Sequence, residues 1–378
     1  MTAFRVRDGV GTALAYALAG TVVVVTWHAH VSLDGSVAAL WHAATSGDLG
    51  LRVEALGSLP GAGLALAAFA GLQALLLRVL PPTQRWRGVG ALALSLGITA
   101  AALGIGGPSL VYDHLGALLV CAAVGGPLLL AGVLVTRGSR GAASSRRRFV
   151  TLCSRVGRCG LAAVGLGLAA EQAARGALSV SMIVCVGLQW LWIGLWLSDE
   201  RRRLDAIDLE SWTAAVTLGG WYLVWLPGGY GSTALYLVHH PVDLGWGLAL
   251  GLGGLGVLCL AGAIEATAQL RRLRDGADDI VVWGRRAEVI GEGPAALLAS
   301  GWWSVARHFG FVLQWMVVLC WSLTALFGHA LPYLAVACLA LVQVVRAFSI
   351  DARRADKHGE AWLEYCRRVP YRLLPGVL

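Results

Sequence analysis

Charged residues are scarce in this sequence. Only 14% of the 378 residues are Asp, Glu, Lys or Arg, whereas 57% are hydrophobic, and the mean hydropathy is +0.68. A chain of this composition has too little polar surface to cover itself in water, which excludes an ordinary soluble globular protein. We therefore expect an all-α, polytopic protein that is embedded in a lipid bilayer.

Paired cysteine motifs are also lacking. No two of the eight cysteines form a CxxC pair, and most of them lie inside predicted membrane spans. This distribution argues against a zinc site and against a disulfide framework, so we predict no metal. The cysteines are Cys121, Cys153, Cys159, Cys185, Cys259, Cys320, Cys338 and Cys366.

About ten hydrophobic runs are long enough to cross a membrane, because a helix needs roughly 20 apolar residues to span the hydrocarbon core. The first run follows Arg5 and Arg7 but has no convincing small-residue cleavage site, so we predict that it is retained as a helix. The predicted spans cover residues 12–32, 58–80, 88–107, 110–136, 159–174, 178–197, 212–227, 243–267, 308–327 and 331–348.

The basic residues predict the orientation, since loops rich in Lys and Arg stay on the cytoplasmic side. With both termini inside, all 30 basic residues except Arg52 and Arg175 lie on or next to the cytoplasmic side. We predict an N-in, C-in topology. The same topology explains the net charge of +8, so we expect no nucleic-acid partner.

The chain is predicted to form one integrated membrane domain with two parts. Residues 1–158 carry the first four helices and a basic cytosolic loop, and residues 159–378 carry the other six helices. Within the first part, the segment RGAASSRRR at 140–148 is predicted to be a flexible loop. The sequence does not determine the oligomeric state.

The seventh span contains Pro227, Gly228, Gly229 and Gly231, which predict a break in that helix. Broken backbone at membrane depth is tolerated where it lines a cavity, which would suit a lipid-like substrate. An ordinary outside loop is the alternative, and both interpretations stay open. Further on, residues 271–293 predict a helix end, a turn, and a short strand-like IVVW segment that could act as a lid.

The C-terminal region combines cations with aromatic rings. Arg346, Arg353 and Lys357 follow one another at spacings of seven and four residues and therefore share one helix face. Such a stripe suits a ligand with several phosphate charges, and nearby rings offer flat stacking surfaces. A basic juxtamembrane helix with an aromatic belt is the alternative. The neighbouring cations and rings are Arg307, Arg367, Arg368, Arg372, Trp302, Trp303, Trp362 and Tyr365.

Three segments carry a resemblance to a known family. They are LLASGWWSVARHFGF from Leu297, GHALPYL from Gly328, and KHGEAWLEYCRRVPYRLLPGVL from Lys357. Together they resemble the C-terminal signature of the sterol C14/C7 reductase family, whose members have ten helices. Upstream the similarity is thinner, and before about residue 178 only the hydropathy agrees.

The resemblance implies an NADPH-dependent reductase of a carbon-carbon double bond in a sterol or sterol-like membrane lipid. It also implies that the cofactor binds at the cytosolic face, where it delivers hydride to a protonated alkene. The pocket residues implied by the matching positions are Arg272, Leu298, Trp303, Arg307, His308, Arg346, Arg353, Arg354, Lys357, His358 and Tyr365.

Several family acids are missing from this chain. Ile350 replaces an Asp of the family, Gly310-Phe311 replaces Asn-Tyr, and Tyr222 stands where the family has another Asp. The remaining candidates for the proton donor are Asp208, Tyr222 and Asp351. Asp351 lies one position from the lost Asp and therefore points about 100° around the helix from it.

Two other functions stay open at this point. The chain could be an S-adenosylmethionine-dependent lipid methyltransferase similar to the isoprenylcysteine carboxyl methyltransferases, although Ile350-Asp351 replaces their Glu-Glu pair. It could also be a non-catalytic, lipid-binding member of the fold. The charge pattern is compatible with the endoplasmic reticulum membrane of a eukaryote and with the inner membrane of a bacterium.

Overall fold

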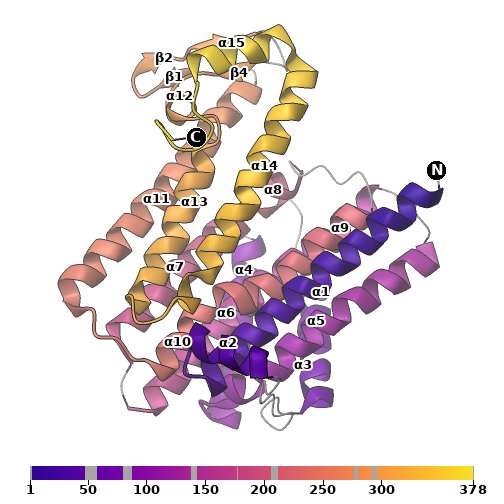
Figure 1. Ribbon diagram of the computed structural model, residues 1–378, viewed down its shortest axis with the longest axis vertical. Coiled ribbons are helices and arrows are strands. Elements are labelled where there is room, and N and C mark those ends of the chain that lie inside the picture. The colour runs from indigo at the N-terminus through magenta and orange to yellow at the C-terminus, as the bar shows by residue number, and fades with distance from the viewer. Residues whose placement is uncertain are drawn as a thin grey trace. The chain divides into compact units, whose positions relative to one another are not determined.

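The computed structural model describes residues 2–46, 58–79, 87–137, 143–176, 178–205, 212–275, 280–291 and 296–377. Helices dominate these ranges, as the hydropathy predicts (Figure 1). The described chain forms two compact units. The first contains residues 1–246 and 324–332, and the second contains residues 247–323 and 333–378. We describe each unit by itself.

The first unit is a helical bundle in which α6 makes contact with α4, α5, α7, α9 and the π-helix η2. Along α1, the packing partners are α5, α9 and η2. The elements are α1 (Thr2–Ser32), α2 (Val37–Ser46), α3 (Leu59–Val79), α4 (Arg87–Gly106), α5 (Leu110–Arg137), α6 (Ala143–Ala174), α7 (Val180–Leu197), α8 (Glu200–Asp205), α9 (Trp212–Gly220), η2 (Trp221–Tyr230) and α10 (Ser232–His239).

The seventh span was predicted to be broken at Pro227 and the neighbouring glycines, and this prediction is wrong because the chain remains helical there. The backbone stays helical from α9 through η2 into α10, with Pro227 inside the π-helix. Proline has no backbone N–H to donate, and a π-helix is a local widening of the helical turn that absorbs such a disruption. Tyr222 and Trp225 of this π-helix are buried in the first unit.

Helix α6 contains the fifth predicted span, 159–174, and extends well before it. Helix α6 starts at Ala143, so Arg146, Arg147 and Arg148 belong to a helix and the predicted loop is wrong for residues 143–148. Residues 140–142 lie outside the described residues. Tertiary contacts explain the longer helix, because Arg155 and Arg158 are buried in it against other helices of the unit.

The second unit contains three long helices and, between α11 and α12, a short segment with two β-hairpins. In Figure 1, α11, α13 and α14 run beside one another, and the strands and α15 lie at the end where α11 and α14 finish. The elements are α11 (Gly245–Arg274), β1 (Val281–Val282), β2 (Arg285–Arg286), β3 (Val289–Ile290), β4 (Leu297–Leu298), α12 (Trp302–Val305), α13 (Phe309–Ser322), α14 (Leu334–His358) and α15 (Glu360–Arg368).

The strand-like IVVW segment is confirmed. Strand β1 pairs antiparallel with β2, with Val281 opposite Arg286, and the two central turn residues Trp283 and Gly284 both have positive φ, 50° and 76°. Positive φ at both positions is the signature of a type I′ turn, whose twist matches that of the strands. A second hairpin pairs Val289 with Leu298.

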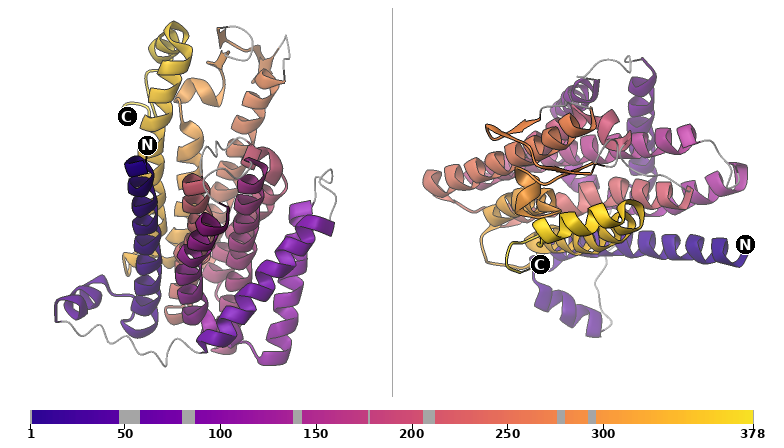
Figure 2. Two further views of the ribbon diagram at one scale, coloured as in Figure 1. Left: turned by 90° about the vertical axis from the view of Figure 1, so that its right-hand side faces the viewer. Right: turned by 90° about the horizontal axis from the view of Figure 1, so that it is seen from above.

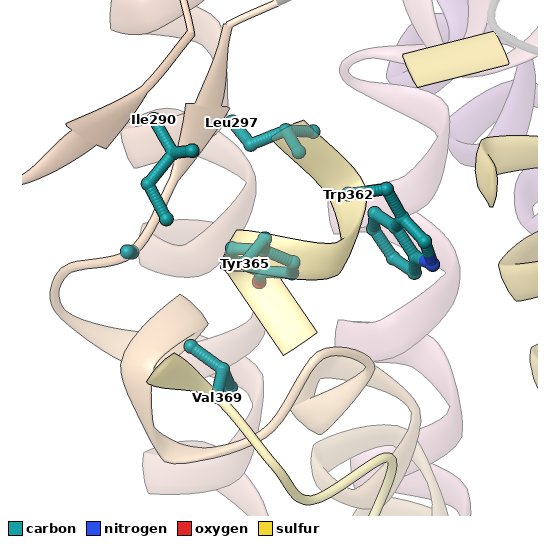
Figure 3. Packing of buried hydrophobic residues seen from close by; sticks show 6 residues of the cluster. Ile290, Leu297, Trp362, Tyr365 and Val369 are labelled. Carbon is teal, nitrogen blue, oxygen red and sulfur yellow. The ribbon is translucent and has the colours of Figure 1, made fainter. Parts of the chain in front are cut away.

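Figure 3 shows the hydrophobic core that holds α15 to this second hairpin. Trp362 and Tyr365 of α15 pack against Ile290 and Leu297 of the strands, together with Val369. Burying a large side chain contributes roughly 1.5–3 kcal/mol, so these two rings alone fix the position of the short helix. The WxxY spacing puts both rings on one helix face.

Each of the ten predicted spans overlaps a helix of the structure. By length and composition, six of the described helices qualify to cross a membrane, or up to seven if a bent pair counts as one span. The bent pair is Tyr16–Ser32 with α2, where the axis turns by 108°, and Figure 2 shows α2 directed away from α1. The count of ten spans and the N-in, C-in topology stay predictions.

Candidate cofactor site

Two of the three C-terminal signature segments, those that begin at Leu297 and Lys357, come together in the second unit, at the end of α11 and α14 that carries the hairpins and α15 (Figure 1). Residues 328–332 of the third segment, GHALPYL, belong to the first unit. Of the predicted site residues, all except Asp208 and Tyr222 belong to the second unit. Asp208 lies outside the described residues, and Tyr222 belongs to the first unit.

Asp351 of α14 is the centre of a buried ion cluster. Its Oδ1 lies 2.8 Å from His308 Nε2, and its Oδ2 accepts a hydrogen bond from Arg372 Nε at 2.7 Å. Arg307 Nε lies 3.4 Å from the same Oδ2. The carboxylate is thus saturated by three partners from two different segments. Hydrogen bonds and nearby cations favour the ionised form of Asp351, which suits an anchor better than a proton donor.

The Arg307-His308 pair also fastens the C-terminal tail by its backbone. Arg307 N and His308 N donate to the carbonyl oxygens of Tyr371 and Arg372 at 3.0 and 2.8 Å. The guanidinium Nη1 of Arg307 donates to Val369 O at 3.0 Å. The RH and VPYR motifs, more than sixty residues apart in the sequence, are therefore one structural unit. The predicted contact of Arg307 and His308 with the cofactor stays a prediction.

Trp303 and Tyr365 are joined by a hydrogen bond from the Tyr365 hydroxyl to Trp303 O, at 3.1 Å. The Trp303 indole donates to Ala266 O of α11 at 2.9 Å. Burial is the main cause that raises the pKa of Tyr365, so its hydroxyl stays a hydrogen-bond donor at any physiological pH. Leu298 is buried in β4 beside this core, and His358 is the last residue of α14.

Glu265 of α11 is a site residue that the sequence reasoning missed. Its carboxylate accepts hydrogen bonds from the indoles of Trp283 and Trp302, each at 2.9 Å, and from Gln269 Nε2 at 3.2 Å. It therefore ties the first hairpin and α12 to α11. The available signal was an acid within a predicted membrane span, which is costly and marks a functional position by default.

We expect Glu265→Leu to loosen the first hairpin, because two indoles lose a charged acceptor worth roughly 1.5–3 kcal/mol for each bond. Hydrogen exchange of the backbone amides of residues 281–286 should become at least about tenfold faster. Asp356→Leu, on the exposed end of α14, is the matched control and should leave that exchange unchanged. Equal exchange in the Glu265 variant and the wild type would show that the indole bonds do not hold the hairpin.

Several exposed cations lie on the same two helices, α11 and α14, as Glu265 and Asp351. Arg272 is in the last turns of α11, and Arg346, Arg353 and Lys357 are on the exposed surface of α14. The guanidinium of Arg354 lies 5.4 Å from the ring centre of Trp362. Arg354 is also within electrostatic range of Arg274, the last residue of α11.

The charge of this donor set suits an anionic ligand, such as one that carries phosphate groups. Cations from the ends of two different helices repel one another, and an anionic ligand between them would relieve that repulsion. The buried members of the predicted pocket bond to other parts of the protein, whereas the exposed cations are open to a ligand. The structure thus separates residues that build the site from residues that can contact a cofactor.

Two residues of α13 lie in or just after the segment where Gly310-Phe311 replaces the Asn-Tyr of the family. Gln314 accepts a hydrogen bond from Gln343 Nε2 of α14 at 2.8 Å. Gly310, in the first turn of α13, has open space on its Cβ side. Among the residues that the structure describes, no three His, Cys, Asp or Glu side chains are grouped as ligands of a metal ion.

The sequence of this chain is similar to those of known proteins. The model of a family described as the ergosterol biosynthesis ERG4/ERG24 family matches residues 148–378. The 7-dehydrocholesterol reductase of Arabidopsis thaliana is 27% identical over 310 residues, which cover 72% of this chain and 71% of that protein. Two Delta(14)-sterol reductases are also similar, and this chain spans about half the length of each.

Of these two, the protein of Methylotuvimicrobium alcaliphilum is 30% identical over 221 residues, covering 57% of this chain and 50% of its own. The protein TM7SF2 of Mus musculus is 33% identical over 232 residues, covering 59% and 53%. The resemblance predicted from the C-terminal motifs is thereby confirmed. Because the matched region is more than half of its length and contains the whole site described above, this chain belongs to the ergosterol biosynthesis ERG4/ERG24 family.

Proposed function

We propose that this protein is an NADPH-dependent reductase of a carbon-carbon double bond in a sterol or sterol-like membrane lipid. The observation that carries the proposal is the set of exposed cations on α11 and α14, next to the buried Asp351 cluster and the exposed hydrogen bonds of Glu265. The named relatives are sterol reductases, which favours this activity over the methyltransferase and over a non-catalytic role. The oligomeric state stays undetermined.

The cofactor contacts that we propose are assigned to predicted site residues whose side chains are exposed or partly exposed and can reach a ligand. Arg272, Arg353 and Lys357 would bind the phosphates of NADPH, and Arg354 beside Trp362 would add a cation next to a flat ring. Trp303 and Tyr365 would hold the floor of the site through their mutual hydrogen bond. When bound, NADPH would supply the hydride.

The protein must then supply the proton. An isolated alkene accepts hydride only after one of its carbons has been protonated, because protonation makes the other carbon cationic. We propose Tyr222 or Asp208 as the donor. The Arg158 guanidinium lies 4.6 Å from the Tyr222 ring centre, where its charge can stabilise the phenolate that remains after proton transfer. Asp351 is the weaker candidate because its oxygens are saturated by cations.

Thermal unfolding in detergent tests cofactor binding, since a ligand that binds only the folded state raises the unfolding temperature. We expect NADPH to stabilise the wild type and S-adenosylmethionine to leave it unchanged. Arg353→Ser should weaken NADPH binding roughly ten- to hundredfold, the effect of one charge-assisted hydrogen bond. Arg367→Ser, on exposed α15, is the matched control.

The outcomes separate the claims. No stabilisation of the wild type by millimolar NADPH would sink the reductase proposal. Stabilisation that is equal in the wild type and the Arg353 variant would keep the reductase proposal and show that the phosphates bind elsewhere.

Turnover tests the proton donor. Conjugated diene sterols incubated with the protein and NADPH should lose their conjugated absorbance. Tyr222→Phe removes only the hydroxyl, so we expect a rate loss of at least about a hundredfold with unchanged NADPH affinity, the upper range for losing a general acid. Full activity of this variant would assign the proton to Asp208, and Asp208→Asn would then be the inactive one.

We further propose that the protein is a multi-pass protein with both termini on the cytoplasmic side, so that the site faces cytosolic NADPH. Its apolar helices and its relatives support an integral membrane protein. Reaction at a membrane-embedded double bond suits a substrate that reaches the site from the lipid phase.

A further inference from the structure

Two buried arginines of α6 lie outside the proposed cofactor site, and one of them, Arg158, also faces the proposed proton donor Tyr222. Arg155 and Arg158 in the first unit are only 1% and 3% exposed. They are three residues apart and therefore share one face of the helix. Because α6 is a candidate membrane span, each of these charges is costly to bury, and such residues mark functional positions.

The described residues provide one buried carboxylate for these cations. Arg155 Nε is 2.7 Å from Glu200 Oε2 of α8. Glu200 is also within electrostatic range of Arg158 and of Arg87 at the start of α4, so three cations share it. Burial raises the pKa of Glu200, and the arginines offset this only in part. At the edge of the cluster, Arg203 is paired with Asp199 at 4.0 Å.

The hydrogen-bonding capacity of the cluster is incomplete. Arg155 Nη1 and Arg158 Nε are buried and have no hydrogen-bond acceptor within the described ranges. The faces of the Arg158 guanidinium are covered by aromatic rings, with Trp196 at 3.2 Å and Tyr222 at 4.6 Å from ring centre to Cζ. Arg158 Nη1 already donates hydrogen bonds to Ser154, to its O at 3.3 Å and to its Oγ, so the edge that carries Nε is the one left for binding an oxygen of an oxyanion.

We propose that Arg155 and Arg158 form a buried oxyanion site in the first unit that binds a phosphate group. The excess of cations over carboxylates supplies the charge, and the two unpartnered N–H groups supply the donors. In the predicted topology, α8 and the start of α6 lie at the cytoplasmic boundary, which is the level of the lipid headgroups. The phosphate could belong to an anionic phospholipid or be free in solution, and the experiment separates these sources.

The experiment measures thermal unfolding of the full chain with two probes. The first probe is inorganic phosphate in neutral detergent, compared with chloride at equal ionic strength. The second is phosphatidic acid in nanodiscs of phosphatidylcholine, compared with phosphatidylcholine alone. Stabilisation by both probes identifies a site for free phosphate, and stabilisation by phosphatidic acid alone identifies a headgroup site. No stabilisation by either probe overturns the proposal.

Three variants test the residues. Arg158→Met should weaken phosphate binding at least about tenfold, because it removes a cation and its donors. Glu200→Gln should instead tighten binding about tenfold, because it removes the competing carboxylate while keeping the shape of the side chain. Arg148→Met, on the exposed surface of the same helix, should leave the affinity unchanged.

If Arg158→Met does not fold, the change in phosphate affinity caused by Glu200→Gln still decides the test, because the proposal requires that affinity to increase. Weaker phosphate binding by Glu200→Gln would overturn the proposal, since it would mean that the carboxylate organises the site rather than competes for it. Unchanged binding by a folded Arg158→Met would overturn it as well.

Residues 206–211 include Asp208 and Glu210, so the same measurements on Asp208→Asn and Glu210→Gln are included. If phosphate binds only to one of these two variants, the replaced carboxylate is the anion that Arg155 and Arg158 bind in the wild type. This result would also overturn the proposal. NADPH binding is a separate measurement and does not enter this test.

Discussion

Asp351→Ala is expected to lower the stability of the protein by about 3–5 kcal/mol, the usual effect of removing one partner from a buried ion pair. Two buried side chains, Arg307 and His308, and the partly buried Arg372 all bond to this carboxylate. Without it, the charges of Arg307 and Arg372 face one another, and the tail at 369–372 loses the bond between Arg372 and α14. Thermal unfolding in detergent should show a fall of roughly 10 °C.

Two controls bracket this effect. Asp351→Asn keeps the shape and one acceptor oxygen, so its loss should be smaller than that of the alanine variant. Asp356→Ala is on an exposed position of the same helix, where substitutions change stability by less than about 0.5 kcal/mol. An unfolding temperature of Asp351→Ala close to that of the wild type would mean that the cluster does not hold the tail.

Gly301→Ala should be the second severe substitution. Gly301 has φ +64° and ψ −134°, a region of backbone conformation that is essentially confined to glycine. An added Cβ would lie 2.5 Å from both Gln269 Oε1 and Val282 Cγ1. Gln269 is buried and its Oε1 accepts the backbone N–H of Trp302, so it cannot move without breaking that bond.

Strain and clash together should lower stability by roughly 3 kcal/mol, and displacement of Trp302 and Trp303 should weaken NADPH binding as well. Gly284→Ala separates the two causes, because Gly284 has φ +76° but open space around its Cβ; we expect a loss of only about 1 kcal/mol there. Gly310→Ala, on helix α13 with open space, should be neutral or slightly stabilising. Similar unfolding temperatures for the Gly301 and Gly284 variants would show that the clash is absent.

Much of the local structure could be predicted from the sequence. The hydropathy located a helix at each of the ten predicted ranges, since apolar runs of this length form helices in lipid. The IVVW strand could be predicted because a short β-branched run is followed directly by a turn at Trp283-Gly284. The family was recognisable because its C-terminal motifs are nearly continuous between residues 297 and 378.

Burial of charge could not be predicted in the same way. Arg155 and Arg158 lie between the predicted spans 110–136 and 159–174, which placed them in a cytoplasmic loop. In the structure they are buried, where Glu200 pairs with Arg155 and two aromatic rings cover Arg158. The break expected at Pro227 failed for a related reason, since neighbouring helices stabilise a π-helix that the local sequence disfavours.

The sequence by itself determined that this protein is helical, apolar and a member of a sterol reductase family, because these properties depend on composition and on contiguous motifs. Only the tertiary structure decided which site residues are anchors and which are open to a ligand. Arg307 and His308 were predicted as cofactor residues and Asp351 as an acid, and these roles stay predictions. The structure adds that both Arg307 and His308 bond to Asp351 and to the C-terminal tail. Partners so far apart in the sequence are chosen by packing, and no local pattern encodes that choice.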